Sequence, residues 1–401
     1  MSLRTAAYAG LLLVVPFSSA FAQDATTVGE RVKSALSRQG TTLSFDRISG
    51  DASTMLIEGA RISIAPESAE IALGNITLTD VRENAGYVVV GSIILPNYSV
   101  TRDGMTVNAT GIGFTNLRLP APDSTDAMAG FWLCDAAQMQ NVTVTIGDKQ
   151  AFAMDRLHFE MDMPANGKSL TFSAAADKFS GDLSVVGDPN ARKLIDALGL
   201  RTVTGTLDLS GFWRPADGRL AIEEYDISID RAGTLGLTFE LGGYTPDFIK
   251  SVQALQKEMA AASEAGENSA QAKSALGLMQ QLTFRSASIR LEDASLTGKM
   301  IDYLAGAQKV TQSDVVNQAK GLLPFLVARL DDAKLTAQTT AAVSTYLDDP
   351  RSIEVTAQPA NPVPFSQIMA AAVSQSLKDL VKILGVSVKA NQPGSDSSAA
   401  E

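Results

Sequence analysis

The chain has 401 residues, of which 45% are hydrophobic and 19% charged, a composition typical of a folded globular protein and not of a disordered one. Its 44 acidic and 33 basic residues give a net charge of -11, which argues against nucleic acid as a partner because phosphate binding requires a cationic surface. A single His and a single Cys exclude a zinc site built from these residue types and a disulfide within the chain.

The first 22 residues have the layout of a secretory signal peptide. Arg4 precedes an apolar core, Ala6–Phe17, and the small residues Ala20 and Ala22 fit a cleavage site before Gln23. An uncleaved anchor helix is the alternative, but the apolar core is shorter than the roughly 20 residues that a membrane span needs. We therefore expect a periplasmic protein, or alternatively a secreted one, that is soluble and has no transmembrane segment after signal cleavage.

After the signal peptide, the segment Thr26–Gln39 carries apolar residues at helical spacing and is predicted to be an amphipathic helix. From about residue 41 to 243 the hydrophobic period changes from about 3.6 to about 2, which predicts a long succession of strands. The expected strands are residues 60–65, 69–80, 86–95, 105–119, 141–146, 156–163, 169–174, 181–186, 203–212, 224–230 and 235–241. Successive strands should pair antiparallel, because turn signals separate them. These signals are Glu83–Gly86, Arg102–Gly104, Gly147–Asp148, Ala165–Gly167 and Ala216–Gly218.

Clean alternation predicts that this sheet has one dry and one wet face. Leu157 and Phe159 fall on one face of their strand, whereas His158 and Glu160 fall on the other. One helix should interrupt the strands at Asp188–Gly199, where an Asp-Pro pair supplies the N-cap and a favourable first turn.

After residue 243 the pattern becomes mainly helical, with a few returning strands. We expect a broken helix or helical hairpin over residues 246–282, interrupted at Ala265–Asn268. Further helices are expected at residues 296–305, 313–330, 333–347 and 364–384, and strands at 283–291, 352–357 and 385–389. The predicted fold class is therefore α+β: a long antiparallel sheet or sandwich, residues about 41–243, with helices from the C-terminal third packed on it.

The expected organisation has four parts. A signal peptide (1–22) is followed by a β-rich region with an N-terminal helix (23–245). A helical region with returning strands (246–390) comes next, and a tail rich in Gly, Ser, Ala and acid (391–401) is expected to be disordered.

The sequence offers no recognisable catalytic constellation. His158 is the first candidate for a general base, but its strand pattern favours a solvated side chain, and no nucleophile motif or phosphate-binding loop accompanies it. Cys134, in an apolar stretch, is expected to be a small buried residue and not a reactive thiol. Adjacent acidic pairs such as Glu223-Glu224 and Glu292-Asp293 are typical of strand ends and solvated surfaces. We therefore expect a non-enzymatic protein and assign no catalytic, cofactor-binding or metal-binding residue.

Two segments carry more apolar surface than an amphipathic element needs. Gly86–Leu95 is apolar on both faces, which suits a strand that is buried on two sides or faces an apolar groove. Val315–Leu330 is apolar over more than half of its helical circumference. It is expected to be a core helix, with a lipid-facing or partner-facing helix as the alternative.

The phrases Ile76–Val81 and Gly205–Gly211 are typical of strands that recur along a curved sheet. In this style the segment Thr41–Leu296 resembles the β-rich exported envelope proteins of the AsmA-like and YdgA-like type, although it carries no diagnostic motif. Those proteins keep an N-terminal membrane helix, whereas this chain is expected to lose its signal. The resemblance implies an envelope protein whose sheet holds acyl chains.

These features together predict an exported periplasmic protein that binds a hydrophobic ligand or lipid, or assists envelope assembly. The alternative is a structural or interaction module of the cell envelope, with an envelope protein as its partner and no small ligand. An apolar groove that stays open would favour the first reading, and a sheet face filled by helices the second.

Overall fold

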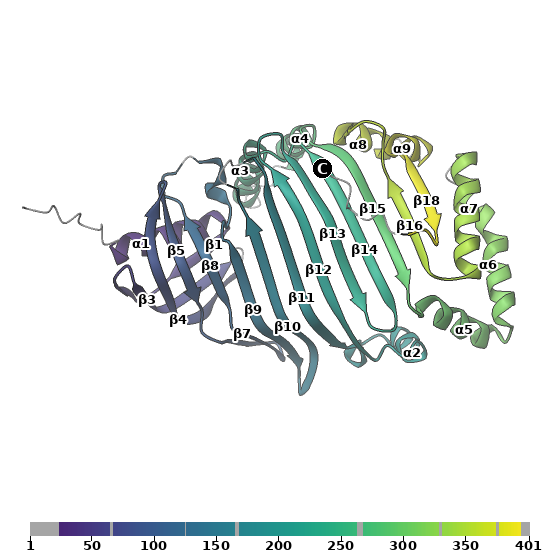
Figure 1. The fold of residues 1–401 in the computed structure, drawn as a ribbon, viewed down its shortest axis with the longest axis horizontal. Helices are drawn as coiled ribbons and strands as arrows, with labels where there is room; N and C mark the ends of the chain where they lie inside the picture. Colours follow the sequence, from purple (N-terminus) through teal and green to yellow (C-terminus); the bar gives the residue numbers. More distant parts are fainter. Residues whose placement is uncertain are drawn as a thin grey trace, which may run out of the picture.

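Figure 1 shows the fold as a computed structural model, which describes residues 24–64, 67–124, 126–164, 168–262, 268–328, 331–373 and 377–393. Among these residues, 18 strands form one antiparallel sheet, so the predicted α+β class with a long antiparallel sheet is confirmed. The expected signal peptide, the turn Ala165–Gly167, most of the break Ala265–Asn268 and residues 394–401 of the expected tail lie outside the described residues.

The strands of the first half are β1 (Thr41–Ser44), β2 (Arg47–Gly50), β3 (Thr54–Ile64), β4 (Glu67–Asn84), β5 (Tyr87–Ile94), β6 (Tyr98–Arg102), β7 (Met105–Thr110), β8 (Gly113–Leu119) and β9 (Ala136–Ile146). Those of the second half are β10 (Lys149–Asp162), β11 (Leu170–Asp182), β12 (Thr202–Arg214), β13 (Arg219–Ile229), β14 (Gly233–Gly242), β15 (Thr283–Asp293), β16 (Ser352–Ala357), β17 (Val363–Pro364) and β18 (Val386–Ala390). The α-helices are α1 (Ala25–Arg38), α2 (Pro189–Ala197), α3 (Pro246–Ala262), α4 (Asn268–Met279), α5 (Leu296–Gln308), α6 (Gln312–Val327), α7 (Ala333–Asp348), α8 (Phe365–Val373) and α9 (Leu377–Leu384).

The order of strands in the sheet follows the chain closely. Starting at β2, each strand pairs with the next in the series β3, β4, β5, β8, β9 and then every strand from β10 to β16, with β18 last. The short strands lie beside this series: β1 pairs with the end of β3, the β6–β7 hairpin with β9, and β17 with β15. Both predicted regions, 23–245 and 246–390, therefore contribute to a single sheet.

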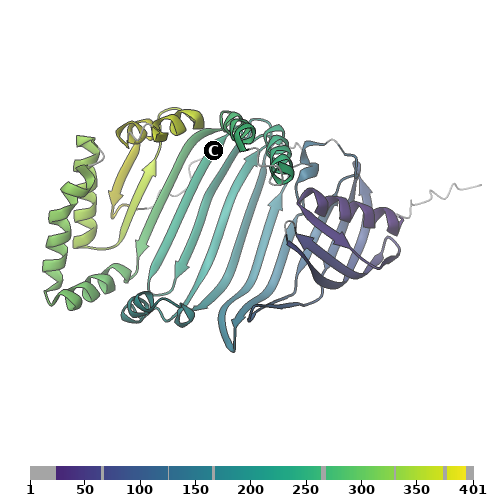
Figure 2. The same cartoon turned by 180° about the vertical axis from the view of Figure 1, so that it is seen from behind.

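The helices are distributed around the sheet unevenly. In Figure 2, α1 lies in front of the first strands, while α3, α4, α8 and α9 follow one rim and α2 and α5 the opposite rim. The pair α6 and α7 stands at the C-terminal end (Figure 1). The helices of the C-terminal third thus pack on the sheet, as predicted, but at its rim and end. Among the described elements, no helix lies across the middle of strands β10–β14 in either view.

The main core lies in the N-terminal third, where α1 closes one face of β3, β4, β5 and β8. Asp24 caps this helix by accepting a hydrogen bond from the backbone amide of Thr26, and Val28 is its most deeply buried residue. Met55 and Leu78 are almost fully buried opposite it. Because such side chains lose all contact with water, they supply much of the stability of this part of the fold.

Two smaller cores hold the other helices in place. Phe248 and Ile249 of α3 pack on Trp213 and Leu241, at the ends of β12 and β14. At the end of the sheet, Leu335, Ala342 and Tyr346 of α7 pack on Val388 and Ala390 of β18.

Several predicted elements differ in their limits. The expected strand 105–119 is two strands, separated where Gly111 adopts a φ of 64° next to Gln140. The expected strand 181–186 is instead the end of β11 followed by a short 3-10 turn, which Asp182 caps through the amide of Ser184. The expected helix 364–384 is the two helices α8 and α9.

The first residue of the predicted tail, Asn391, belongs to the fold. The Asn391 side chain accepts a hydrogen bond from the Ser352 amide at 3.0 Å and donates one to the Asp349 carbonyl at 2.8 Å. Residue 391 is therefore an ordered part of the fold.

We expect Leu78→Ala to lower the free energy of unfolding by about 2–5 kcal/mol, because it removes one of the most deeply buried side chains of the main core. Ile289→Ala, whose side chain is 54% exposed, is the control and should cost about 1 kcal/mol or less. Urea denaturation followed by circular dichroism measures both. Equal losses for the two variants would contradict this placement of the core.

Candidate hydrophobic binding surface

The strand register gathers the apolar side chains of the sheet on one face. One cross-strand row runs through Met55, Leu78, Ile93, Phe114, Ala137, Phe159, Ala174, Leu209 and Tyr225. A second row runs through Met139, Leu157, Ala176, Leu207, Ile227, Leu235, Leu291, Ile353 and Ala390. Side chains paired across strands lie on the same face. We call the side that carries these rows the apolar face.

Large aromatic side chains cover two glycines on this face. A Cβ atom at Gly211 would lie 2.8 Å from the ring of Phe172, and one at Gly205 would lie 2.7 Å from the ring of Phe179. Both distances are too short for real carbon atoms, and the carbonyl oxygens of Ser228 and Ala221 in β13 would be closer still, so both positions require glycine. The result is apolar surface where β12 itself has no side chain.

A partly open cavity lies under α1 at the N-terminal end of the apolar face. Its volume is about 210 Å³. The lining is entirely apolar: Val32, Leu36, Leu43, Ile57, Ile62, Leu73, Ile76, Leu78, Ile93, Leu95, Phe114, Leu117 and Trp132. Leu78, Ile93 and Phe114 also belong to the first cross-strand row, so the wall of the cavity is part of the apolar face.

Aromatic side chains mark the place where the cavity meets the open sheet. The rings of Phe114 and Trp132 are 5.7 Å apart, and Phe159 of β10 packs against the same core. Cavities of about 150 Å³ lined by such side chains stay dry and hold molecules the size of benzene. This cavity therefore suits the end of a hydrocarbon chain and not a whole lipid.

Farther along the sheet the apolar face is open to solvent. Leu235, Ile289 and Val355, on the neighbouring strands β14, β15 and β16, are 40%, 54% and 43% exposed. Three large apolar side chains grouped in this way are unusual on a solvated sheet, where single exposed apolar residues are the norm. Beyond them α7 covers Ile353 and Val388, so the open stretch has a helix at each end.

The opposite face is polar across the same strands. Its equivalent row runs through Gln138, His158, Ala175, Asp208, Asp226, Gly236, Arg290, Glu354 and Lys389. Burial raises the pKa of Asp226, and the nearby charges of Glu224, Glu292 and Asp208 add to this effect. In the described part of the chain, no group of three His, Cys, Asp or Glu side chains could hold a metal ion.

The strongest charge interaction of the polar face centres on Glu240. Arg219 donates to both of its carboxylate oxygens, at 2.5 and 3.1 Å, and Arg285 approaches one of them at 2.5 Å. Burial raises the pKa of Glu240, but the hydrogen bonds and charges of the two guanidinium groups outweigh it and hold the pKa below its usual value. These contacts tie β13, β14 and β15 together.

The structure also shows where the residues named in the sequence analysis lie. His158 is exposed on the polar face, as its strand pattern predicted, and Cys134 is buried. In the predicted two-sided strand, Val88, Val89 and Val90 are all buried, so β5 is covered on both faces there. Sequence reasoning missed the cavity and Trp132, although the apolar stripe of α1 was a signal that this helix covers a sheet.

Comparison with known proteins does not assign a function to the chain. Residues 226–391 match a family model described only as "Uncharacterized protein", which covers less than half of the chain and runs from β13 to the end of β18. No curated protein matches the chain significantly. Among the described residues, no helix combines the length and apolar character that crossing a bilayer requires.

We expect Glu240→Gln to destabilise the protein most at neutral pH. A carboxylate with a lowered pKa stabilises the fold above its unfolded-state pKa and loses this effect as the pH falls through its folded-state pKa. The difference in free energy of unfolding between wild type and variant should therefore be largest at pH 7 and shrink toward about pH 3. Urea titrations at several pH values measure it, and a difference that stays constant would contradict this role of Glu240.

Proposed function

We propose that this chain is an exported, non-enzymatic protein of the cell envelope that binds a lipid or another hydrophobic ligand through its acyl chain. The single observation that carries the proposal is the continuity of the apolar face with the cavity under α1. In this reading the chain end enters the cavity, and the rest of the hydrocarbon lies across the sheet.

The dimensions of the surface agree with such a ligand. From Ile93 to Tyr225 the first row crosses six strand intervals, which at about 4.8 Å each span roughly 29 Å. One leaflet of a bilayer contributes about half of a hydrocarbon core that is about 30 Å thick. An acyl chain therefore fits along this row with room to spare.

The polar face supports an assignment to binding instead of catalysis. Arg290 on this face is paired with Glu354, at 3.5 Å, and the single histidine is solvated. The apolar face contributes no nucleophile or general base from either cross-strand row apart from the Tyr225 hydroxyl. Recognition there would rest on hydrophobic contact, which is non-directional and tolerates many acyl chains.

The second candidate is an interaction module whose apolar face receives a protein partner in the envelope. The exposed group Leu235, Ile289 and Val355 favours it equally, because large apolar patches are also typical of protein interfaces. The cavity separates the two functions, since a protein partner on the open strands has no need of it.

We expect a fatty acid brominated near its methyl end to quench the fluorescence of Trp132, which lines the cavity. The chain contains two tryptophans, so Trp213→Phe leaves Trp132 as the reporter. A fatty acid brominated near its carboxyl group should quench it less. In the complementary variant Trp132→Phe, Trp213 is buried under α3 and should respond weakly. Equal quenching by both fatty acids, or none, would contradict entry of the chain end into the cavity.

We further expect Ile289→Gln combined with Val355→Gln to reduce co-purifying lipid several-fold, because the pair lies in the open stretch of the apolar face. The control is Thr238→Gln combined with Ser288→Gln, a neighbouring pair on the polar face whose hydroxyls are 2.8 Å apart. Native mass spectrometry of protein purified gently from the envelope measures bound lipid. A wild-type protein that is always lipid-free would overturn the proposal in favour of a protein partner.

A further inference from the structure

The C-terminal half of α6 exposes its apolar side chains to solvent. Leu322, Phe325 and Leu326 are 53%, 78% and 67% exposed. They are spaced three and four residues apart and therefore share one side of the helix. Residues 321–328 contain no charged side chain. The expectation of an ordinary core helix is thus wrong for this half, whereas Val315 near the start of the helix is buried.

Another exposed apolar side chain lies on α8, at the rim of the sheet. Val373, the last residue of α8, is 79% exposed. An ion pair at 2.9 Å joins Lys378 of α9 to Asp331, which lies just before α7 in the chain. We call the group Leu322, Phe325 and Leu326 on α6 the apolar corner.

The apolar corner lies at an extremity of the molecule. Figures 1 and 2 both place α6 outside α7, at the end of the sheet opposite α1. A stable protein interface buries about 800 Å² on each partner and involves some 20–30 residues. A few apolar side chains that project from a helix end are too few for this, but they suffice to enter the boundary between head groups and acyl chains.

We propose that the apolar corner inserts into the surface of a lipid bilayer and docks the protein there. Phe and Leu are residues that bury themselves at this depth. The charged neighbours of the corner have mixed signs, with Lys378 paired to Asp331 and Lys320 to Asp348, and the whole chain carries -11. Docking is therefore driven by hydrophobic contact and not by attraction to anionic lipid.

This docking surface is distinct from the cavity, and the exposure of the α6 side chains supports it independently. It rests on the proposed function in one respect only: the corner lies at the end where α7 borders the apolar face, so a docked protein would bring this face close to its source of acyl chains. The experiment below separates the two ideas.

The test is flotation of the purified protein with vesicles of phosphatidylcholine alone. We expect the wild type to float with the vesicles, and Phe325→Ser combined with Leu326→Ser to lower its partition coefficient at least about tenfold. Both side chains are exposed, so the variant should keep the circular dichroism and unfolding midpoint of the wild type. Raising the salt concentration, or adding anionic lipid, should not strengthen or weaken binding by more than about twofold.

The matched control is Ile94→Ser combined with Ile146→Ser, which removes two exposed apolar side chains from the N-terminal half of the sheet. It should float like the wild type. Failure of the wild type to float, equal floating of the two double variants, or release by salt would overturn the proposal. A change of oligomeric state in the α6 variant, seen by analytical ultracentrifugation, would instead make the corner a contact with a second copy.

Quenching of Trp132 by brominated fatty acid added without vesicles should be unchanged in the α6 variant, because the cavity lies at the other end of the sheet. Loss of floating with intact quenching would locate membrane docking in the corner. Floating without quenching would sustain docking while the acyl-binding proposal fails.

Discussion

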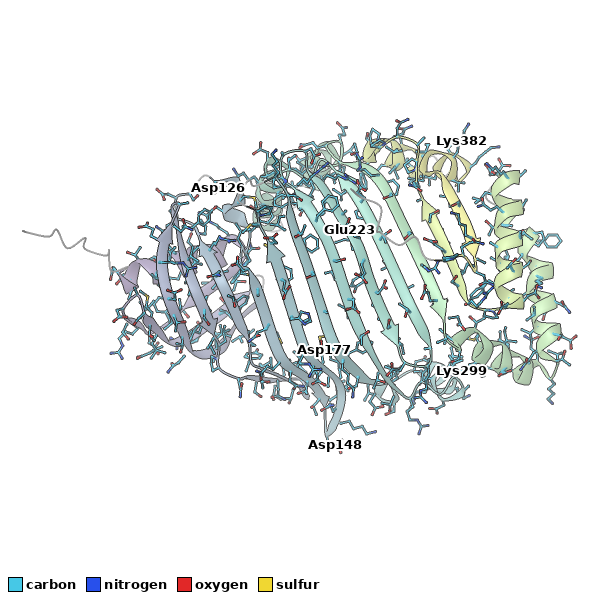
Figure 3. The ribbon with its side chains drawn as sticks, in the orientation of Figure 1. Asp126, Asp148, Asp177, Glu223, Lys299 and Lys382 are labelled. Atoms are coloured by element: carbon cyan, nitrogen blue, oxygen red, sulfur yellow. The ribbon has the colours of Figure 1, made fainter. Side chains whose placement is uncertain are left out.

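The antiparallel register is the constraint on which the rest of the structure depends. A slip of one residue in any strand would move its apolar side chains to the polar face and interrupt the continuous surface. Two bulges preserve the register where the sequence places two polar residues together. In β13, Glu223 is the extra residue between Ile222 and Glu224, and in β11 the pair Asp177-Lys178 lies opposite one residue of β12 (Figure 3 labels Asp177 and Glu223).

Much of this architecture could be predicted from local patterns. Period-two alternation placed Leu157 and His158 on opposite faces, and short turn signals such as Arg102–Gly104 indicated antiparallel hairpins. The limits of the strands were harder to predict. Two adjacent polar residues such as Glu223-Glu224 look like the end of a strand, but here they mark a bulge within β13. The break at Gly111 depends on close packing against Gln140 that spacing does not reveal.

The candidate site could be predicted only in its chemical character. A surplus of apolar residues was visible in Gly86–Leu95 and in the segment that forms α6. Their fates differ for reasons of tertiary structure: Val90 is buried because α1 closes that part of the sheet, whereas Phe325 is exposed because no described element covers its side of α6. The continuity between Trp132 and the open strands depends on pairings that no single segment encodes.

The nearly sequential order of the strands also bears on how the chain acquires its shape. Because each strand from β9 to β16 pairs with the strand before it, most contacts form between neighbouring segments, and little loop entropy opposes them. From β9 onward the sheet can therefore add its strands in chain order, directly or after an intervening set of helices. Every partly assembled stage has an unpaired growing edge, which is a template for pairing with another chain until the next strand joins.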